Sequence, residues 1–268
     1  MMISNHDFSE ATGTTVIPGL APFLMRLMKI EAFNHLMHKA EGLEGVAFAD
    51  YLLKTLGITV QLNKTDLEHI PKQGAFIVVA NHPYGAIESL ALLSILVKQR
   101  PDTMFMGNFL LKKVPNLADY IIAVNPFESV KHSSSISGLK NTIRMLKEGT
   151  PVAIFPAGEV SSFDQRSKQI TDKPWHPIVG KIIAKAKVPV VPIYFHGNNG
   201  LWFSLLRYIH PSLQTAMLPT ELFNKKGHVL RVCIGQPVTN DNVNDNHNSD
   251  MHLEHLRHTT YALANSDR

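Results

Sequence analysis

Several features are scarce or missing in this sequence, and each absence narrows the possible classes of protein. The 268 residues include one cysteine, Cys233, so no disulfide can form within the chain. The N-terminal stretch MMISNHDFSE lacks the basic and then apolar pattern of a secretory signal peptide. These two absences predict a protein of a reducing, cytoplasmic compartment.

Membrane-spanning runs and several catalytic motifs are missing as well. No apolar run approaches the roughly 18 residues that a membrane-spanning helix needs. The absence of a G-x-S-x-G segment disfavours a serine hydrolase, and there is no P-loop. His252, His255 and His258 recur on one predicted helix without a nearby cysteine, which indicates a solvated helix face. We therefore expect neither a metal site nor a cofactor.

The composition is that of a folded protein with a moderately basic surface. Hydrophobic residues make up 44% of the chain and charged residues 18%. The formal net charge is +4 and the pI is about 9.1, which favours acidic partners. Anionic lipid, an acidic carrier protein and nucleic acid all fit, and charge alone does not choose among them.

Predicted strands alternate with predicted helices along most of the chain. Apolar or alternating runs predict strands at 58–63, 76–80, 103–106, 120–124, 151–155, 188–195 and 229–234. Helical spacing predicts helices at 43–56, 137–147, 176–186, 201–224 and 250–264, and residues 161–175 are predicted as a polar loop. This order predicts a single α/β domain at 58–268, with a mostly parallel mixed sheet flanked by helices.

A helical region is predicted to precede that domain. Residues 17–38 have the spacing of an amphipathic helix, with Arg26 and Lys29 beside the apolar face. Such a helix fits either a membrane interface or a protein core. With 43–56 it makes an amphipathic two-helix motif, and we expect residues 1–57 to be a membrane-docking region.

The stretch 76–88, FIVVANHPYGAIE, holds the strongest candidates for catalysis. His82 follows a predicted buried strand, and Glu88 falls in the first turn of the next helix. In open α/β sheets, ligands bind outside the carboxyl ends of the strands. His82 is therefore a candidate general base with Glu88 as its partner. The alternative is a histidine that caps the helix, with Glu88 stabilised by the helix dipole.

Two other predicted strands end in turns rich in glycine and polar residues, PAGE at 156–159 and HGNNG at 196–200. If the strands are parallel, these turns meet the His82 turn at one edge of the sheet. The convergence supports an active site more strongly than any single turn does.

These motifs resemble the PlsC-type superfamily of 1-acylglycerol-3-phosphate acyltransferase-like lysophospholipid acyltransferases, over about residues 58–238. Asn81-His82 with Glu88 resembles its first motif, FPAGEVS at 155–161 its third, and VPVVP at 188–192 its fourth. With DKPWHP at 172–177, they look like the hemolysin-like branch. That branch includes O-acyltransferases that make ornithine and glycine lipids.

The resemblance implies an enzyme of membrane lipid biosynthesis, peripheral on the cytoplasmic face of the inner membrane. It implies that His82, assisted by Glu88, deprotonates a lysolipid hydroxyl, which attacks the thioester of acyl-ACP or acyl-CoA. The expected partners are this donor, the lysolipid and the membrane surface, without nucleic acid. The residues expected to bind substrate are Asn81, Phe155, Pro156, Ala157, Gly158, Glu159, Lys112 and Lys113. Backbone N–H groups near Gly158 are candidates to stabilise the oxyanion.

The chain departs from the superfamily at cations that would meet a phosphate. No arginine occurs between Arg100 and Arg144, where the second motif usually carries one. In the third motif Ala157, Glu159 and Val160 replace the usual Glu, Thr and Arg. A phosphate without such a partner is poorly held. We therefore expect a zwitterionic or amino-acid lysolipid with its ammonium group near Glu159, unless Lys112 or Lys113 replaces the arginine.

Two other functions remain open at this stage. A non-catalytic protein that binds or perturbs membranes would fit the hemolysin-like label but does not require His82 with Glu88. A thioesterase would transfer the acyl group to water instead of a lysolipid.

Overall fold

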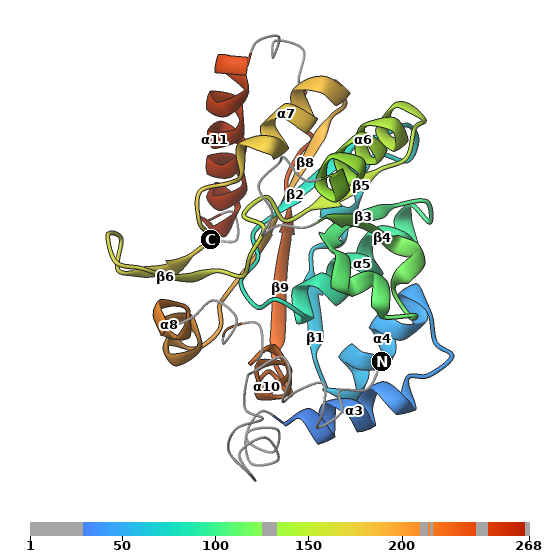
Figure 1. Ribbon diagram of the computed structural model, residues 1–268, viewed down its shortest axis with the longest axis vertical. Coiled ribbons are helices and arrows are strands. Elements are labelled where there is room, and N and C mark those ends of the chain that lie inside the picture. Colours follow the sequence, from blue (N-terminus) through green and yellow to red (C-terminus); the bar gives the residue numbers. More distant parts are fainter. Residues whose placement is uncertain (1–28, 125–132, 210–213, 215–216, 240–245, 266–268) are drawn as a thin grey trace.

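A seven-stranded sheet runs through the middle of the molecule, with helices on both faces (Figure 1). The computed structural model describes residues 29–124, 133–209, 214, 217–239 and 246–265. The strands lie in the order β1-β9-β8-β2-β5-β3-β4. Their bounds in that order are β1 (Thr59–Leu62), β9 (Val229–Ile234), β8 (Val190–Phe195), β2 (Ile77–Ala80), β5 (Val152–Ile154), β3 (Met104–Asn108) and β4 (Ile121–Val124).

Five neighbouring strands run in the same direction, and this direction places the candidate site. β8, β2, β5, β3 and β4 pair in parallel. β9 pairs antiparallel with β8 and parallel with β1. The predicted mixed, mostly parallel sheet is therefore confirmed. The carboxyl ends of five strands lie along one edge, with β2 in the middle of the whole sheet.

The two faces of β2 belong to two different helical layers. Val78 and Ala80 lie in a core cluster with α3 (Ile30–Lys39), α4 (Gly45–Thr55) and α5 (Ile87–Gln99). Ile77 and Val79 lie in a second cluster with α6 (Ser133–Lys147), α7 (Pro177–Ala186) and α11 (Asn246–Ala262). All four strand residues are fully buried, so apolar side chains on both faces fix the strand that ends before His82.

The remaining elements are short and gather mainly at the edges of the sheet. A two-stranded hairpin is formed by β6 (Ser162–Asp164) and β7 (Gln169–Thr171), and the helices α8 (Leu201–Ile209) and α10 (Leu218–Asn224) follow β8. The 3₁₀ helices in the described part of the chain are η2 (Lys64–His69), η3 (Phe109–Lys113), η4 (Ala118–Tyr120) and η5 (Leu263–Asn265). The prediction of a plain loop at 161–175 was wrong, because three-residue strands are too short to show a periodic pattern. The helical prediction at 201–224 is confirmed at both of its ends, where α8 and α10 lie.

The N-terminal region contributes to the core where it is described. Residues 17–28 of the predicted amphipathic helix lie outside the described residues, and α3 covers the rest. Leu36 of α3 and Phe48 of α4 are buried in the same cluster as α5. No helix in the described ranges is long and apolar enough to cross a membrane. Membrane docking by residues 1–57 stays a prediction.

Candidate active site

Three turns meet where the parallel strands β8, β2 and β5 end. The Ser161 N–H, beyond the β5 turn, donates to the His82 carbonyl at 2.8 Å. The Asn199 N–H, from the β8 turn, donates to the Pro83 carbonyl at 3.2 Å. The predicted convergence of the three turns is therefore confirmed.

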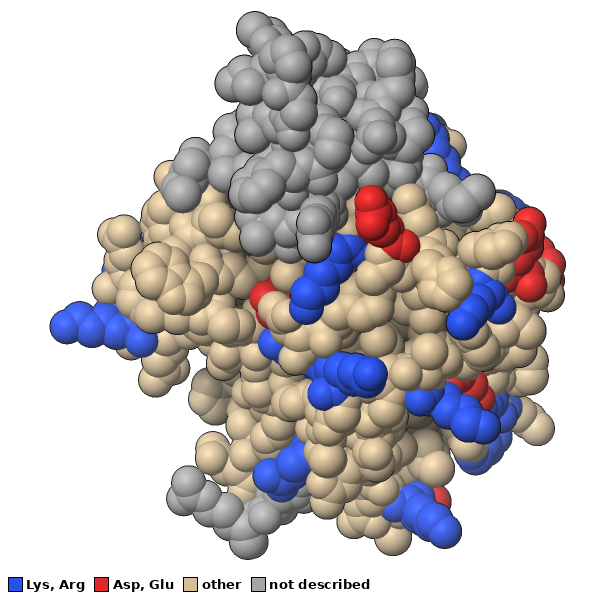
Figure 2. All heavy atoms as spheres, turned by 90° about the horizontal axis from the view of Figure 1, so that it is seen from below, with Lys and Arg blue, Asp and Glu red and all other residues tan. Residues whose placement is uncertain are grey.

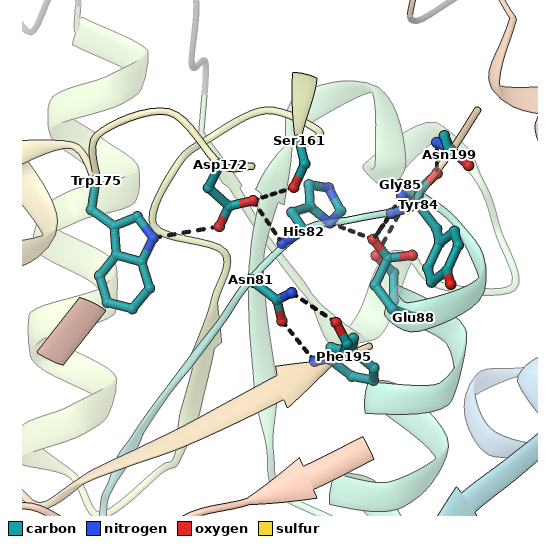
Figure 3. Close-up of polar contacts among 11 residues, drawn as sticks. Asn81, His82, Tyr84, Gly85, Glu88, Ser161, Asp172, Trp175, Phe195 and Asn199 are labelled. Atoms are coloured by element: carbon teal, nitrogen blue, oxygen red, sulfur yellow. Dashed lines mark hydrogen bonds and ion pairs between the residues drawn. The ribbon is translucent and has the colours of Figure 1, made fainter. Parts of the chain in front are cut away.

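His82 and Glu88 face one another within this group of turns (Figure 3). His82 Nδ1 lies 3.0 Å from Glu88 Oε1, although its N–H bond is not aligned as in a straight hydrogen bond. Catalytic hydrogen bonds are often poorly aligned before substrate binds. Because Nδ1 faces the carboxylate, Nε2 is the ring nitrogen left to accept a proton. This is the geometry of a general base with an orienting carboxylate.

Glu88 is completely buried at the start of α5 and is held by backbone donors. Its Oε1 accepts the N–H of Tyr84 at 2.8 Å and that of Gly85 at 2.6 Å. Gly85 has φ of +94°, and a Cβ there would lie 2.6 Å from Leu218 Cδ2. A glycine is therefore needed for the turn that aims two amides at the carboxylate.

Phe155 forms one wall of the histidine site. Its ring stacks on the His82 ring, with the centroids 4.1 Å apart and the planes at 23°. Phe155 comes directly after β5, the neighbour of β2, so the parallel pairing brings the two rings together. The stack and the Glu88 contact together restrict rotation of the imidazole.

Asn81 ties the ends of two strands together. Its Nδ2 donates to the Phe195 carbonyl at 2.8 Å, and its Oδ1 accepts the Phe195 N–H at 2.7 Å. The side chain is buried, so it holds the end of β2 against β8 immediately before His82. The contact with substrate expected for Asn81 stays a prediction.

Tyr84 fixes the other side of the His82 turn. Its hydroxyl donates to the His196 carbonyl at 2.9 Å, and it also lies 2.9 Å from His228 Nε2. Burial and then the charge of Glu88 raise the pKa of Tyr84 to about 12. The phenol therefore stays neutral, and Tyr84 links the His82 turn to the HGNNG turn.

The residues of the third motif have varied surroundings. Pro156 is buried and its carbonyl accepts the His176 N–H at 2.9 Å, whereas Ala157 is half-buried against the α7 side of the sheet. The Gly158 N–H donates to the Phe155 carbonyl at 3.0 Å, so it is not free to bind an oxyanion in this structure. Their contacts with substrate stay predictions.

Glu159 forms an ion pair with Lys173 of the DKPWHP segment. Both side chains are partly exposed, so the pair is accessible to solvent. The sequence did not single out Lys173, because nothing in the spacing of DKPWHP shows a contact with Glu159. The third motif therefore has a cation beside it, supplied by a later loop.

Lys112 and Lys113 lie farther from the histidine. They are exposed on η3 after β3, two strands away from β2 in the sheet order. Lys112 lines an open groove of about 690 Å³ together with Phe109, β4 and residues 137–141 of α6. The two lysines therefore belong to a separate surface on the same edge.

Asp172 is a further buried carboxylate, and the sequence did not single it out. It accepts the His82 N–H at 3.1 Å and the Ser161 hydroxyl at 2.5 Å (Figure 3). The only signal in the sequence was its place in DKPWHP. That segment does start a helix as well, since His176 caps α7 by accepting the Ile178 N–H at 3.2 Å.

Metal ligation has no support in the part of the chain that is described. No group of three or more His, Cys, Asp or Glu side chains there is arranged to hold a metal ion. The polar groups around His82 instead form hydrogen bonds and one ion pair with each other. The site suits proton transfer by a histidine to and from bound substrates.

Comparison with known proteins supports this interpretation. A family model described as "Acyltransferase" matches residues 9–268. The chain is 23% identical over 252 residues to a protein of Bacteroides thetaiotaomicron named lyso-glycine lipid O-acyltransferase, covering 90% of this chain and 88% of the other. A protein of the same name from Phocaeicola vulgatus is 25% identical over 227 residues, covering 81% and 77%.

A solved structure shares the fold. The crystal structure of the 1-acyl-sn-glycerophosphate (LPA) acyltransferase PlsC from Thermotoga maritima matches with a TM-score of 0.50 and 18% identity. The match covers 91% of this chain and 93% of that chain. The predicted α/β fold is therefore confirmed, and the family model with the two relatives confirms the predicted acyltransferase superfamily.

Proposed function

The chain belongs to this acyltransferase family, and we propose that it transfers a fatty acyl group from an acyl thioester to the hydroxyl of a lysolipid. The observation that carries the proposal is the contact between His82 Nδ1 and the buried Glu88, 3.0 Å long, at the carboxyl end of β2. A protein that only binds lipid does not need such a pair. Family membership makes the protein an enzyme, and the site residues below are part of the proposal.

In the proposed reaction His82 acts as the general base. Its Nε2 takes the proton of the acceptor hydroxyl while the hydroxyl oxygen attacks the carbonyl carbon of the thioester. The tetrahedral intermediate collapses, the carbon–sulfur bond breaks, and the imidazolium returns the proton to the departing thiolate. Glu88 keeps the ring oriented and stabilises the imidazolium. The reaction needs no covalent enzyme intermediate and no cofactor, with acyl-ACP or acyl-CoA as the co-substrate.

The acceptor is proposed to be a lysolipid with an amino-acid headgroup, such as a lyso-glycine or lyso-ornithine lipid. Two relatives named lyso-glycine lipid O-acyltransferase support this class. The ammonium expected near Glu159 is replaced in the structure by the chain's own Lys173. We propose that Lys173, which follows Asp172 in the chain, is the cation that meets an anionic headgroup. A glycine lipid, which has no side-chain ammonium, fits this arrangement better than an ornithine lipid.

Association with a membrane surface is the second part of the proposal. Large apolar side chains are exposed on α8, including Leu201 at 53%, Trp202 at 83% and Tyr208 at 52%. Figure 2 shows the face seen from below, where Lys and Arg side chains are spread widely and Asp and Glu are fewer. Exposed aromatic residues beside cations are typical of binding to an anionic bilayer. We propose a peripheral position on the cytoplasmic face of the inner membrane.

Lys112 and Lys113 are proposed to meet the acyl donor. They are exposed beside a groove that also contains apolar residues of β4, and acyl carrier proteins and CoA are both acidic. An acidic donor would be attracted to this part of the sheet edge.

Purified protein, labelled acyl-ACP or acyl-CoA and a set of lysolipids test the proposal. We expect transfer to lyso-glycine or lyso-ornithine lipid and little to lysophosphatidic acid. Lys173→Ala should lower transfer to lyso-glycine lipid, whose headgroup is anionic, more than transfer to lyso-ornithine lipid. A strong preference for lysophosphatidic acid would contradict the acceptor class. Free fatty acid released regardless of acceptor would indicate a thioesterase, and liposome leakage without transfer would indicate a membrane-perturbing protein.

A further inference from the structure

Asp172 is a buried side chain to which the proposed reaction assigns no role. It lies between β7 and α7 and is 2% exposed. Oδ1 accepts the His82 N–H and the Ser161 hydroxyl, and Oδ2 lies 3.5 Å from Trp175 Nε1 (Figure 3). Within the described ranges, no Lys or Arg side chain contacts this carboxylate. A buried charge is costly without compensation, so the hydrogen-bond donors around this carboxylate are what stabilise it.

The hydrogen bonds of Asp172 close a ring around the backbone of His82. The carboxylate accepts the His82 N–H at 3.1 Å, and the Ser161 N–H donates to the His82 carbonyl at 2.8 Å. The Ser161 hydroxyl then donates to the same carboxylate oxygen at 2.5 Å. Both polar backbone groups of His82 are thus held by one loop segment and one carboxylate.

The set of partners requires a group that only accepts hydrogen bonds. The His82 N–H and the Trp175 indole N–H are donors that cannot reverse their roles. An asparagine at 172 would accept with its oxygen but turn an N–H toward one of these donors. A carboxylate is therefore the side chain that fits this position, because both of its oxygens can accept from these donors.

The position of Asp172 is itself fixed from another element. Its own N–H donates to the Tyr261 hydroxyl of α11 at 3.1 Å, and the Thr171 hydroxyl also donates to Tyr261 at 3.2 Å. Arg257 of α11 lies with its guanidinium 5.2 Å from the centre of the Tyr261 ring. The C-terminal helix therefore supports the loop that holds His82, so Asp172 does not depend on His82 for its place.

Burial raises the pKa of the Asp172 carboxyl, and its hydrogen bonds with Ser161 and His82 oppose that rise. With both oxygens occupied and almost no exposure, Asp172 cannot reach a substrate. An effect of Asp172 on the reaction would have to pass through the residues that it contacts, such as His82.

We propose that Asp172 is a positioning residue that fixes the backbone of His82, so that the ring meets Glu88 and the acceptor hydroxyl at the same time. This inference rests on the proposed function, since it assumes that His82 is the base. It assigns the DKPW segment a role in the reaction besides starting α7. A misplacement of about 1 Å at a reacting group can lower a rate about 10²-fold.

The test compares Asp172→Asn with wild-type protein in the transfer assay. We expect kcat to fall about 10²-fold with KM nearly unchanged, because the substrate sites are intact while the base is misplaced. The loss should be equal at all temperatures at which circular dichroism shows a folded variant. A wild-type kcat in Asp172→Asn, or a loss that grows with temperature as unfolding proceeds, would overturn the inference.

Two further variants keep the test informative. Asp164→Asn is the matched control, because Asp164 accepts hydrogen bonds from Ser167 in the exposed hairpin and should leave kcat unchanged. If Asp172→Asn does not fold, Ser161→Ala removes one donor of the ring and should lower kcat by a smaller factor; an unchanged kcat would contradict the inference. Failure of the proposed function can be told apart from failure of this inference, because the wild-type protein itself would then transfer to no lysolipid.

Discussion

Two buried carboxylates hold His82 from different sides, and they hold different parts of the residue. Glu88, at the start of α5, contacts the ring, whereas Asp172, before α7, contacts the backbone N–H (Figure 3). Oε1 of Glu88 also accepts two backbone amides, and Asp172 accepts a hydroxyl and an indole. Glu88 therefore orients the imidazole ring that takes the proton, whereas Asp172 fixes the position of the His82 backbone.

The His82 turn and the loop that carries Asp172 are fixed by different parts of the fold. The His82 turn is fixed by its own residues and by β8, through Asn81 and Tyr84. The loop that carries Asp172 is fixed by α11, which lies on the face of the sheet opposite to α5. Mutations in the two regions should therefore have different signatures, and the predictions below separate them.

The largest effect after loss of the histidine itself is expected at Glu88. Glu88→Ala removes the partner of the ring and leaves the Tyr84 and Gly85 N–H groups without their acceptor. Transfer should fall about 10²-fold, part of the 10²–10⁴-fold that a general base contributes. Unfolding free energy should also fall, by about 1–3 kcal/mol for each buried group left unpaired.

Glu88→Gln separates these two roles of the side chain. Its amide oxygen can still accept the two backbone N–H groups, but the charge beside the imidazole is gone. We expect a melting temperature close to that of wild type with a clear loss of kcat. Equal activity in Glu88→Gln and wild type would show that the charge is not needed.

A combined variant tests whether both carboxylates act through one histidine. Groups that serve the same base are not additive in their effects on rate. Glu88→Gln with Asp172→Asn should therefore lose less activity than the product of the two single losses. A fully multiplicative loss in kcat would mean that Asp172 acts elsewhere.

The smallest effect on chemistry is expected away from both carboxylates, on α8. Trp202→Ala removes a side chain that is 83% exposed, so transfer from and to detergent-solubilised substrates should not change. Binding to anionic liposomes should weaken about 10- to 10²-fold, since burying such a side chain contributes about 1.5–3 kcal/mol. Met251→Ala, at a residue 70% exposed on α11, is the control and should bind liposomes normally. Unchanged liposome binding by Trp202→Ala would remove α8 from the proposed membrane contact.

The sequence predicted the His82 side of the site better than the Asp172 side. His82 and Glu88 lie six residues apart in one strand–turn–helix, so local spacing was enough to pair them. Asp172 follows a hairpin of three-residue strands and reaches His82 across 90 positions of the chain. No periodicity links residues so far apart, and the contacts of the loop with α11 and with Ser161 bring them together in the folded chain.

The same reasoning explains the outcome for the sheet and the lysines. Apolar runs such as that of β2 predicted the strands, because burial on both faces leaves a plain signal, and the alternation of strands with helices predicted a mostly parallel sheet. The role of Glu159 depended on Lys173, fourteen positions later and in another loop, which spacing alone does not show. Contacts between loops are decided by tertiary structure.

The most direct test of the account is acyl transfer by His82→Ala beside a matched control. His38 also lies near a carboxylate, with Nδ1 3.2 Å from Glu41 Oε2, but its side chain is 66% exposed on α3. His82→Ala should fold normally and lose about 10²–10⁴-fold in transfer to a lysolipid, whereas His38→Ala should transfer at the wild-type rate. Wild-type transfer by folded His82→Ala would contradict the assignment of His82 as the base.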